Sequence, residues 1–136
     1  MVWLGIDMGG TATRWAASDS AGAVLARGKV AGAWAVPDAA LRDGYCAVLR
    51  EIAMAAPAPV FGVVLGLTGA GLTPEAELIA HTAQALGLGP AKLTLMNDME
   101  LAWHAVYPQG GGHLVAACTG SVGLSIDADG AVTLVG

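Results

Sequence analysis

The amino-acid sequence predicts an α/β protein with the element order β-β-β-α-β-α-β-α, followed by a glycine-rich linker and three more strands. Three observations support this prediction. Short apolar runs are separated by polar, glycine-containing turns, which is typical of strands. Longer segments have apolar residues at helical spacing. The run 60–67 is apolar at every position, glycines apart, which is typical of a parallel strand buried on both faces.

The first three predicted strands are short and closely connected. They cover residues 2–7, 13–18 and 23–30. Turns are expected at Gly9-Gly10 and at Ser20-Ala-Gly22, because glycine tolerates turn conformations. A helix is predicted next, since Pro37-Asp38 opens a segment with helical periodicity that ends before Pro57. The periodic apolar residues are Leu41, Tyr45, Val48, Leu49 and Ile52.

Two strand–helix pairs are predicted to follow. The strands cover 60–67 and 92–96. Thr73-Pro74-Glu75 is expected to start the first helix, because threonine caps helices, proline suits the first turn and an acid there complements the helix dipole. This helix ends at Gly87. Asn97-Asp98 is expected to start the second helix, which ends near Tyr107-Pro108.

The segment Gln109-Gly-Gly-Gly112 is expected to be a linker between two domains. Three short strands follow it, at 113–118, 122–126 and 131–135. The predicted domains are therefore an N-terminal lobe over 1–108 and, over 109–136, the linker and first strands of an incomplete second lobe. These last strands are expected to lack a covering helix and to have open edges, so they are expected either to be poorly ordered or to pair with a second copy of the chain.

Composition limits the classes of function open to the chain. Of its 136 residues, 55% are hydrophobic and 12% are charged, and the formal net charge is −5. Soluble domains have on average about 25% charged residues. The apolar content excludes disordered, collagen-like and coiled-coil proteins. Six Lys and Arg against eleven Asp and Glu do not form a basic surface, so no nucleic-acid partner is expected.

No membrane partner is expected either. The most apolar stretch, 53–67, is interrupted by prolines and glycines, whereas a spanning helix needs about 20 consecutive apolar residues. The N-terminus has no basic region and carries Asp7, so a signal peptide is not expected. Cys46 and Cys118 have neither metal-ligand nor redox spacing, which is typical of buried thiols in a reducing compartment. The expected location is the cytoplasm.

Three polar turns contain the candidate functional residues. In the first, Asp7 ends an apolar strand and is followed by Gly9, Gly10 and Thr11. Glycines let backbone N–H groups approach phosphate oxygens, and a nearby acid can hold Mg²⁺ through water. The alternative is a glycine hairpin with a surface acid. That alternative is less favoured, because an acid at the end of a buried strand is costly.

The second and third turns each have a structural and a functional interpretation. Asp98 is either the N-cap of a helix or a carboxylate that accepts a proton from a substrate hydroxyl. Its position after a strand is where open α/β sheets bind ligands. Cys118-Thr119-Gly120-Ser121 is either a hairpin turn or a second phosphate-binding loop.

Together, the three turns and the element order resemble the sugar kinase/Hsp70/actin superfamily. Gly-Ile-Asp-Met-Gly-Gly-Thr is similar to its first phosphate motif, and Cys-Thr-Gly-Ser is similar to its second. The closest resemblance is to the N-acetylglucosamine kinase and glucosamine kinase group, which belongs with the BadF/BadG/BcrA/BcrD ATPases. The resemblance implies a ribonuclease H-like (actin-like ATPase) domain. It covers the whole chain, but only the N-terminal part of such proteins.

The resemblance also implies a role for each residue. Asp7 would hold the Mg²⁺ of ATP and Asp98 would act as general base. The phosphates would be bound by Gly9, Gly10, Thr11, Thr119, Gly120 and Ser121, and the sugar by Asn97, Thr68 and Gly69. One departure concerns the segment Gly32–Pro37, where the amino-sugar kinases usually place an asparagine and this chain has none. Trp34 in that segment is expected either to stack on a sugar or to pack in the interior or an interface.

The predicted function is the N-terminal lobe of an ATP-dependent sugar kinase. It would transfer a phosphoryl group from Mg-ATP to a hydroxyl of an amino sugar such as N-acetylglucosamine or glucosamine. The chain by itself is expected to be inactive, because the resemblance places the adenosine pocket in the other half. Two alternatives stay open: an activator ATPase of the BadF/BadG type, and a non-catalytic binding or assembly module of the same fold.

Overall fold

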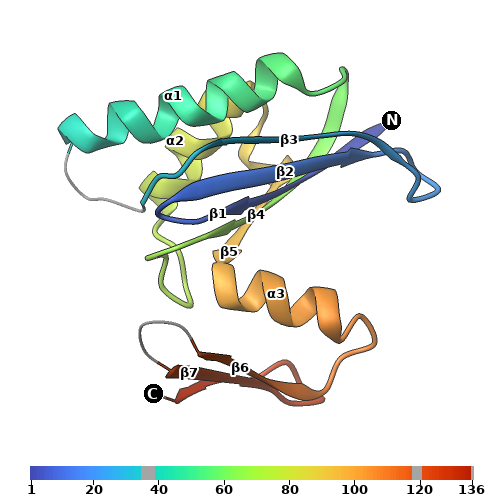
Figure 1. Cartoon of the computed structure of the whole chain (residues 1–136), viewed down its shortest axis with the longest axis vertical. Coiled ribbons are helices and arrows are strands. Elements are labelled where there is room, and N and C mark those ends of the chain that lie inside the picture. The colour runs from blue at the N-terminus through green and yellow to red at the C-terminus, as the bar shows by residue number, and fades with distance from the viewer. Residues whose placement is uncertain (35–38, 118–120, 136) are drawn as a thin grey trace. The chain divides into compact units, whose positions relative to one another are not determined.

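The structure is a computed structural model that describes residues 1–34, 39–117 and 121–135. By its contacts the chain divides into two compact units, Met1–Asp98 and Met99–Gly136. The predicted order of helices and strands is confirmed (Figure 1). The first unit contains β1 (Val2–Met8), β2 (Ala12–Ser18), β3 (Val24–Ala31), α1 (Ala39–Ala55), β4 (Val60–Leu67), α2 (Ala76–Leu86), the 3₁₀ helix η1 (Pro90–Lys92) and β5 (Leu93–Asn97).

Five strands of the first unit form one mixed sheet in the order β3-β2-β1-β4-β5. The first three strands pair antiparallel, whereas β4 pairs parallel with both β1 and β5. Parallel strands need a crossover connection, and α2 supplies the one between β4 and β5. The prediction of a central parallel strand at 60–67 is therefore confirmed.

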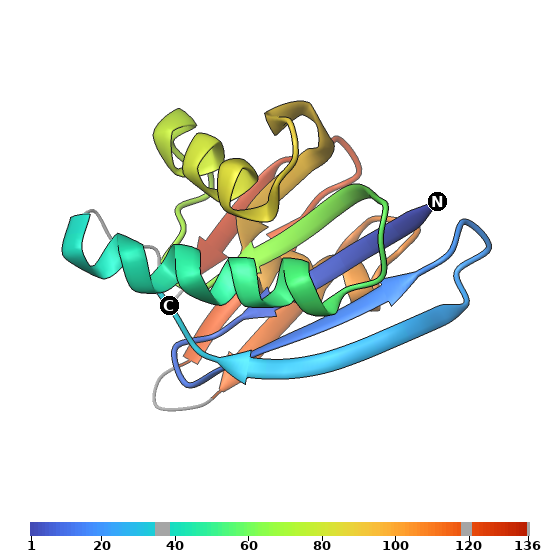
Figure 2. The ribbon, with the colours of Figure 1, turned by 90° about the horizontal axis from the view of Figure 1, so that it is seen from above.

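Successive side chains of β1 point to opposite faces of the sheet, so every second side chain enters the core. Val2, Leu4, Ile6 and Met8 are buried, while the residues between them are exposed. Helices α1 and α2 cover the buried face of the sheet (Figure 2). Each fully buried aliphatic side chain contributes about 1.5–3 kcal/mol to stability. Asp7 points away from this face, so the core does not enclose its carboxylate.

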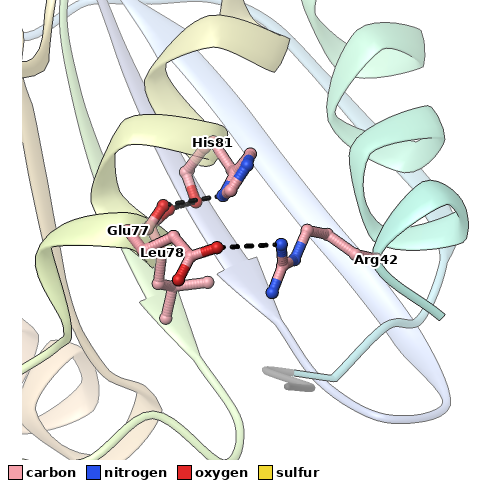
Figure 3. Close-up of polar contacts among 5 residues, drawn as sticks. Arg42, Glu77, Leu78 and His81 are labelled. Atoms are coloured by element: carbon pink, nitrogen blue, oxygen red, sulfur yellow. Dashed lines mark hydrogen bonds and ion pairs between the residues drawn. The ribbon is translucent and has the colours of Figure 1, made fainter. Parts of the chain in front are cut away.

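Polar contacts join α1 to α2. The hydroxyls of Tyr45 and Thr82 share a buried hydrogen bond, and burial raises the pKa of Tyr45 to about 12. At the surface, Arg42 Nη1 donates to Glu77 Oε1 at 3.1 Å, and His81 Nδ1 donates to the backbone oxygen of Glu77 at 2.8 Å (Figure 3). A cleft of about 490 Å³ lies between the two helices, and none of the predicted site residues lines it.

The second unit combines a helix with a small antiparallel sheet. It contains α3 (Asp98–Val106), which begins at the last residue of the first unit, and the strands β6 (Gly112–Ala117), β7 (Ser121–Ile126) and β8 (Val132–Val135). Trp103 of α3 is 2% exposed, packs with Leu124 and Ile126, and donates from Nε1 to the Gly112 oxygen at 2.9 Å. The expectation that no helix covers these strands is therefore wrong.

Because Trp103 packs on the second sheet, the boundary between the two units lies at the start of α3 and not after it. The expected domain boundary follows residue 108, whereas the contacts place α3 with the second sheet and the division after Asp98. The sheet has the strand order β6-β7-β8, so its edges are β6 and β8. Pairing of these edges with another copy of the chain stays a prediction.

Replacing Trp103 with phenylalanine is expected to destabilise the second unit by about 1–3 kcal/mol, because the smaller ring removes the hydrogen bond to Gly112 and leaves space in the cluster. Chemical denaturation followed by near-ultraviolet circular dichroism measures this loss. The half-exposed Trp3 provides the control, since Trp3→Phe removes the same atoms outside this cluster. Equal stability of the two variants would contradict the assigned role of Trp103.

The start of α2 differs from its prediction. The helix begins at Ala76, and Glu75 occupies the N-cap position without a side-chain hydrogen bond to the helix. Thr73 therefore lies two residues too early to cap it. The predicted end is confirmed, since Gly87 has a φ of 72° and its N–H bonds to the last turn. Within the described ranges, no helix is both long enough and apolar enough to span a membrane.

Candidate active site

The register of the parallel strands brings the turns that follow β1, β4 and β5 to one edge of the sheet. Met8 pairs with Leu67, and Leu67 pairs with Asn97. The residues that follow these three, Gly9, Thr68 and Asp98, therefore leave the sheet side by side. Ligands of open α/β sheets bind outside the carboxyl ends of the strands, so this edge is the expected place for a site.

Hydrogen bonds tie the turn after β4 to its two neighbours. The Thr68 N–H donates to the Met8 oxygen at 3.0 Å, and Thr68 Oγ1 donates to Asp98 Oδ2 at 2.7 Å. Asn97 Nδ2 donates to the Ala70 oxygen at 2.6 Å. The structure thus brings together the predicted residues Thr68, Asn97 and Asp98. It also gives Asn97 a structural bond, while a contact between Asn97 and a sugar stays a prediction.

Glycine is required in this turn at one position. Gly69 has a φ of 82°, a conformation that residues with a side chain rarely adopt. This φ lets the chain reverse directly after Thr68 and places the Ala70 oxygen where Asn97 reaches it. The role of Gly69 in the structure is therefore conformational, and its predicted position next to the sugar is a hypothesis that agrees with its place in the turn.

Asp98 lies close enough to Asp7 for its negative charge to affect the ionisation of Asp7. Partial burial at the end of β1 raises the pKa of Asp7, the negative charge of Asp98 raises it further, and the positive charge of Arg14 lowers it. Arg14 lies directly opposite Asp7 in the antiparallel pair of β1 and β2. Two neighbouring carboxylates repel each other, so the pair offers oxygen ligands whose negative charge a divalent cation would neutralise.

The chemistry of this pair fits Mg²⁺, which prefers carboxylate oxygens and usually keeps several waters. In the parts of the chain that the structure describes, no group of three or more His, Cys, Asp or Glu side chains forms a metal site. The magnesium hypothesis therefore rests on Asp7 with Asp98 beside it. Sequence reasoning gave no role to Arg14; only the pairing of the first two strands reveals that it faces Asp7.

The glycine turn, defined as Gly9–Thr11, connects β1 to β2. The Gly9 N–H donates to the Ala12 oxygen at 3.0 Å and closes the turn. A side chain at Gly10 would overlap the indole ring of Trp34. Glycine at this position is therefore needed for packing as well as for the predicted approach of a phosphate. Trp34 is 55% exposed, so the expectation of an interior position is not met.

The third predicted turn is only partly described. Thr119 and Gly120 lie outside the described residues, as does Cys118. Ser121 is the first residue of β7 and belongs to the second unit. The predicted phosphate-binding role of Thr119, Gly120 and Ser121 stays a prediction. Cys46, the free cysteine that the structure describes, is buried as expected.

The fold and the aligned turns define the class: the chain has the fold of the N-terminal half of an actin-like ATPase. No family model matches the sequence, and a comparison with curated proteins gives no match. Solved structures do match. A Chromobacterium violaceum protein assigned as an N-acetylglucosamine kinase is 26% identical, with a TM-score of 0.70, over 98% of this chain and 47% of that one.

Two further structures have the same fold. A ROK family glucokinase from Streptomyces griseus, solved with glucose and AMPPNP, is 23% identical with a TM-score of 0.63 over 99% of this chain and 46% of its own. A Porphyromonas gingivalis protein assigned as an N-acetylglucosamine kinase is 22% identical with a TM-score of 0.65, over 96% of this chain and 46% of its own. The chain thus spans about half the length of these structures, and its resemblance to sugar kinases is confirmed for the fold.

Proposed function

We propose that this chain is the N-terminal lobe of an ATP-dependent kinase that phosphorylates a hydroxyl of an amino sugar such as N-acetylglucosamine or glucosamine. The observation that supports this most directly is the neighbouring pair Asp7 and Asp98 beside the glycine turn. The similarity to a protein assigned as an N-acetylglucosamine kinase supports the choice of sugar. Activity belongs to a complete two-lobed kinase, since this chain spans about half of such structures.

Asp98 is proposed as the general base. It would take the proton from the attacking sugar hydroxyl, and the hydrogen bond from Thr68 holds its carboxylate in place for that transfer. Phosphoryl transfer depends mainly on positioning and on neutralising charge. When bound, Mg²⁺ would supply positive charge to the phosphate oxygens, and Asp7 is the residue proposed to hold it, through water.

The phosphates themselves are proposed to lie against backbone N–H groups of the glycine turn, with Thr119, Gly120 and Ser121 contributing from the second lobe. Asn97, Thr68 and Gly69 are proposed to lie beside the sugar. The proposal includes a cytoplasmic location, where ATP is available and thiols such as Cys46 stay reduced. It also includes a homodimer, formed through the open strand edges of the second unit.

Isothermal titration calorimetry of this chain with sugars and with Mg-ATP tests the proposal. We expect saturable binding of N-acetylglucosamine or glucosamine, and weak binding of Mg-ATP because the adenosine pocket is expected in the other half. Tight nucleotide binding without sugar binding would contradict the proposal and favour an activator ATPase. Binding of neither ligand would favour an assembly module.

A further inference from the structure

We propose that Trp34 is the positioning residue of the glycine turn: its indole packs on Gly10 and holds the turn in the conformation that receives the phosphates of Mg-ATP. This inference rests on the proposed function, because it assumes that the glycine turn binds phosphate. It goes further by giving a role to a side chain outside the three predicted turns. The occupant of the site is a phosphate chain, and Trp34 acts on it through the turn.

The backbone contacts of the segment Gly32–Trp34 show that it is docked on the turn. The Ala33 N–H donates to the Gly9 oxygen at 3.1 Å, and Ala33 is buried. Gly32 lies so close that a side chain there would overlap the backbone of Gly9 and Gly10. The segment is therefore fixed against the turn by main-chain contacts, and Trp34 follows directly.

The indole of Trp34 packs directly on Gly10 and adds a side-chain contact to these main-chain contacts. The six-membered part of the ring occupies the space where a side chain of Gly10 would lie. At the same time Trp34 is 55% exposed, unlike Trp15 and Trp103, which are buried. Trp34 does not belong to the core cluster. Its contact with the glycine turn therefore explains why a large aromatic side chain lies at this half-exposed position.

The composition of the turn explains why it needs such a contact. Glycine has more backbone freedom than any other residue, and this turn contains two glycines in succession. A phosphate site, however, binds more tightly when its N–H donors are already oriented before the ligand arrives. In this chain the restraint comes from outside the turn, through the ring of Trp34 and the hydrogen bond from Ala33.

Nuclear magnetic resonance of the ¹⁵N-labelled chain tests the inference, because it detects the weak Mg-ATP binding that we expect of a half-length protein. The chain has four tryptophans, so the indole signals are few enough to assign. Mg-ATP is expected to shift the amide signals of Gly9 and Gly10 and the indole signal of Trp34. Without ligand, Trp34→Ala is expected to move the same amide signals and to speed exchange of the Ala33 amide by about tenfold.

The variant should also weaken Mg-ATP binding by about tenfold or more, since small displacements of binding groups have large effects. Trp34→Phe, which keeps an aromatic ring, should restore part of the affinity. Trp3→Ala is the matched control: Trp3 is 41% exposed but packs on Phe61, and removing its ring should change neither the turn signals nor the affinity for Mg-ATP. Gly10→Ala tests the same contact from the other side, because the added methyl group should displace the indole ring of Trp34.

The outcomes separate this inference from the proposed function. If Mg-ATP shifts Gly9 and Gly10 but Trp34→Ala binds it equally well with unchanged turn signals, the inference is wrong and the proposed function stands. If Mg-ATP leaves the glycine turn of the wild-type chain unaffected, both are wrong. Weakened binding and altered turn signals in Trp34→Ala, together with partial recovery in Trp34→Phe, would support the inference.

Discussion

Replacing Asp98 with asparagine in a complete kinase that contains this lobe is expected to lower kcat by about 10²–10⁴-fold, the usual contribution of a general base. Asparagine has nearly the same shape, and its amide oxygen can still accept the hydrogen bond from Thr68. What it cannot do is take a proton from the sugar hydroxyl. The measurement is the rate of ADP release at saturating sugar and ATP.

A comparison with Thr68→Val separates proton transfer by Asp98 from the positioning of its carboxylate by Thr68. Thr68→Val removes the hydroxyl that donates to Asp98 at 2.7 Å but leaves the carboxylate in place, so its effect on kcat should be smaller than that of Asp98→Asn. Both variants should retain the KM for ATP, because neither residue is proposed to bind phosphate. Full activity of Asp98→Asn would remove Asp98 from the mechanism, whatever the behaviour of Thr68→Val.

The elements of this fold were predictable because their signals are local. The uniformly apolar run of β4 indicated a central parallel strand, and the structure places β4 between two parallel neighbours. The turns at Gly9-Gly10 and Asn97-Asp98 lay at strand ends in the sequence, and parallel register was enough to bring them to one edge.

Other features depend on contacts between distant segments and had no local signal. Arg14 faces Asp7 because of the pairing of β1 and β2, which a sequence pattern does not specify. Trp34 was expected either to stack on a sugar or to pack in the interior or an interface, but its packing on Gly10 depends on how the chain returns after β3. Helix α3 packs with the second sheet through Trp103, although its sequence is continuous with the first lobe.

Replacing Asp7 with asparagine is expected to stabilise the fold at neutral pH and to remove its response to Mg²⁺. Burial and the nearby Asp98 raise the pKa of Asp7 above its ordinary value of 3.8. The folded state therefore binds the proton of Asp7 more tightly than the unfolded state does. The stability that this provides is complete below the unfolded pKa and is lost as pH rises through the folded pKa.

The stability difference between Asp7→Asn and the wild type should therefore grow as pH rises from near 3.8 towards 7, as thermal unfolding would show. Mg²⁺ at ten times its dissociation constant should stabilise the wild-type chain by about 1.4 kcal/mol and leave Asp7→Asn unchanged. Asp43→Asn, which removes an exposed acid from α1, is the matched control and should keep the wild-type response. An equal response to Mg²⁺ in all three proteins would place the metal elsewhere. A loss confined to Asp7→Asn would show that the carboxylate of Asp7 binds the cation.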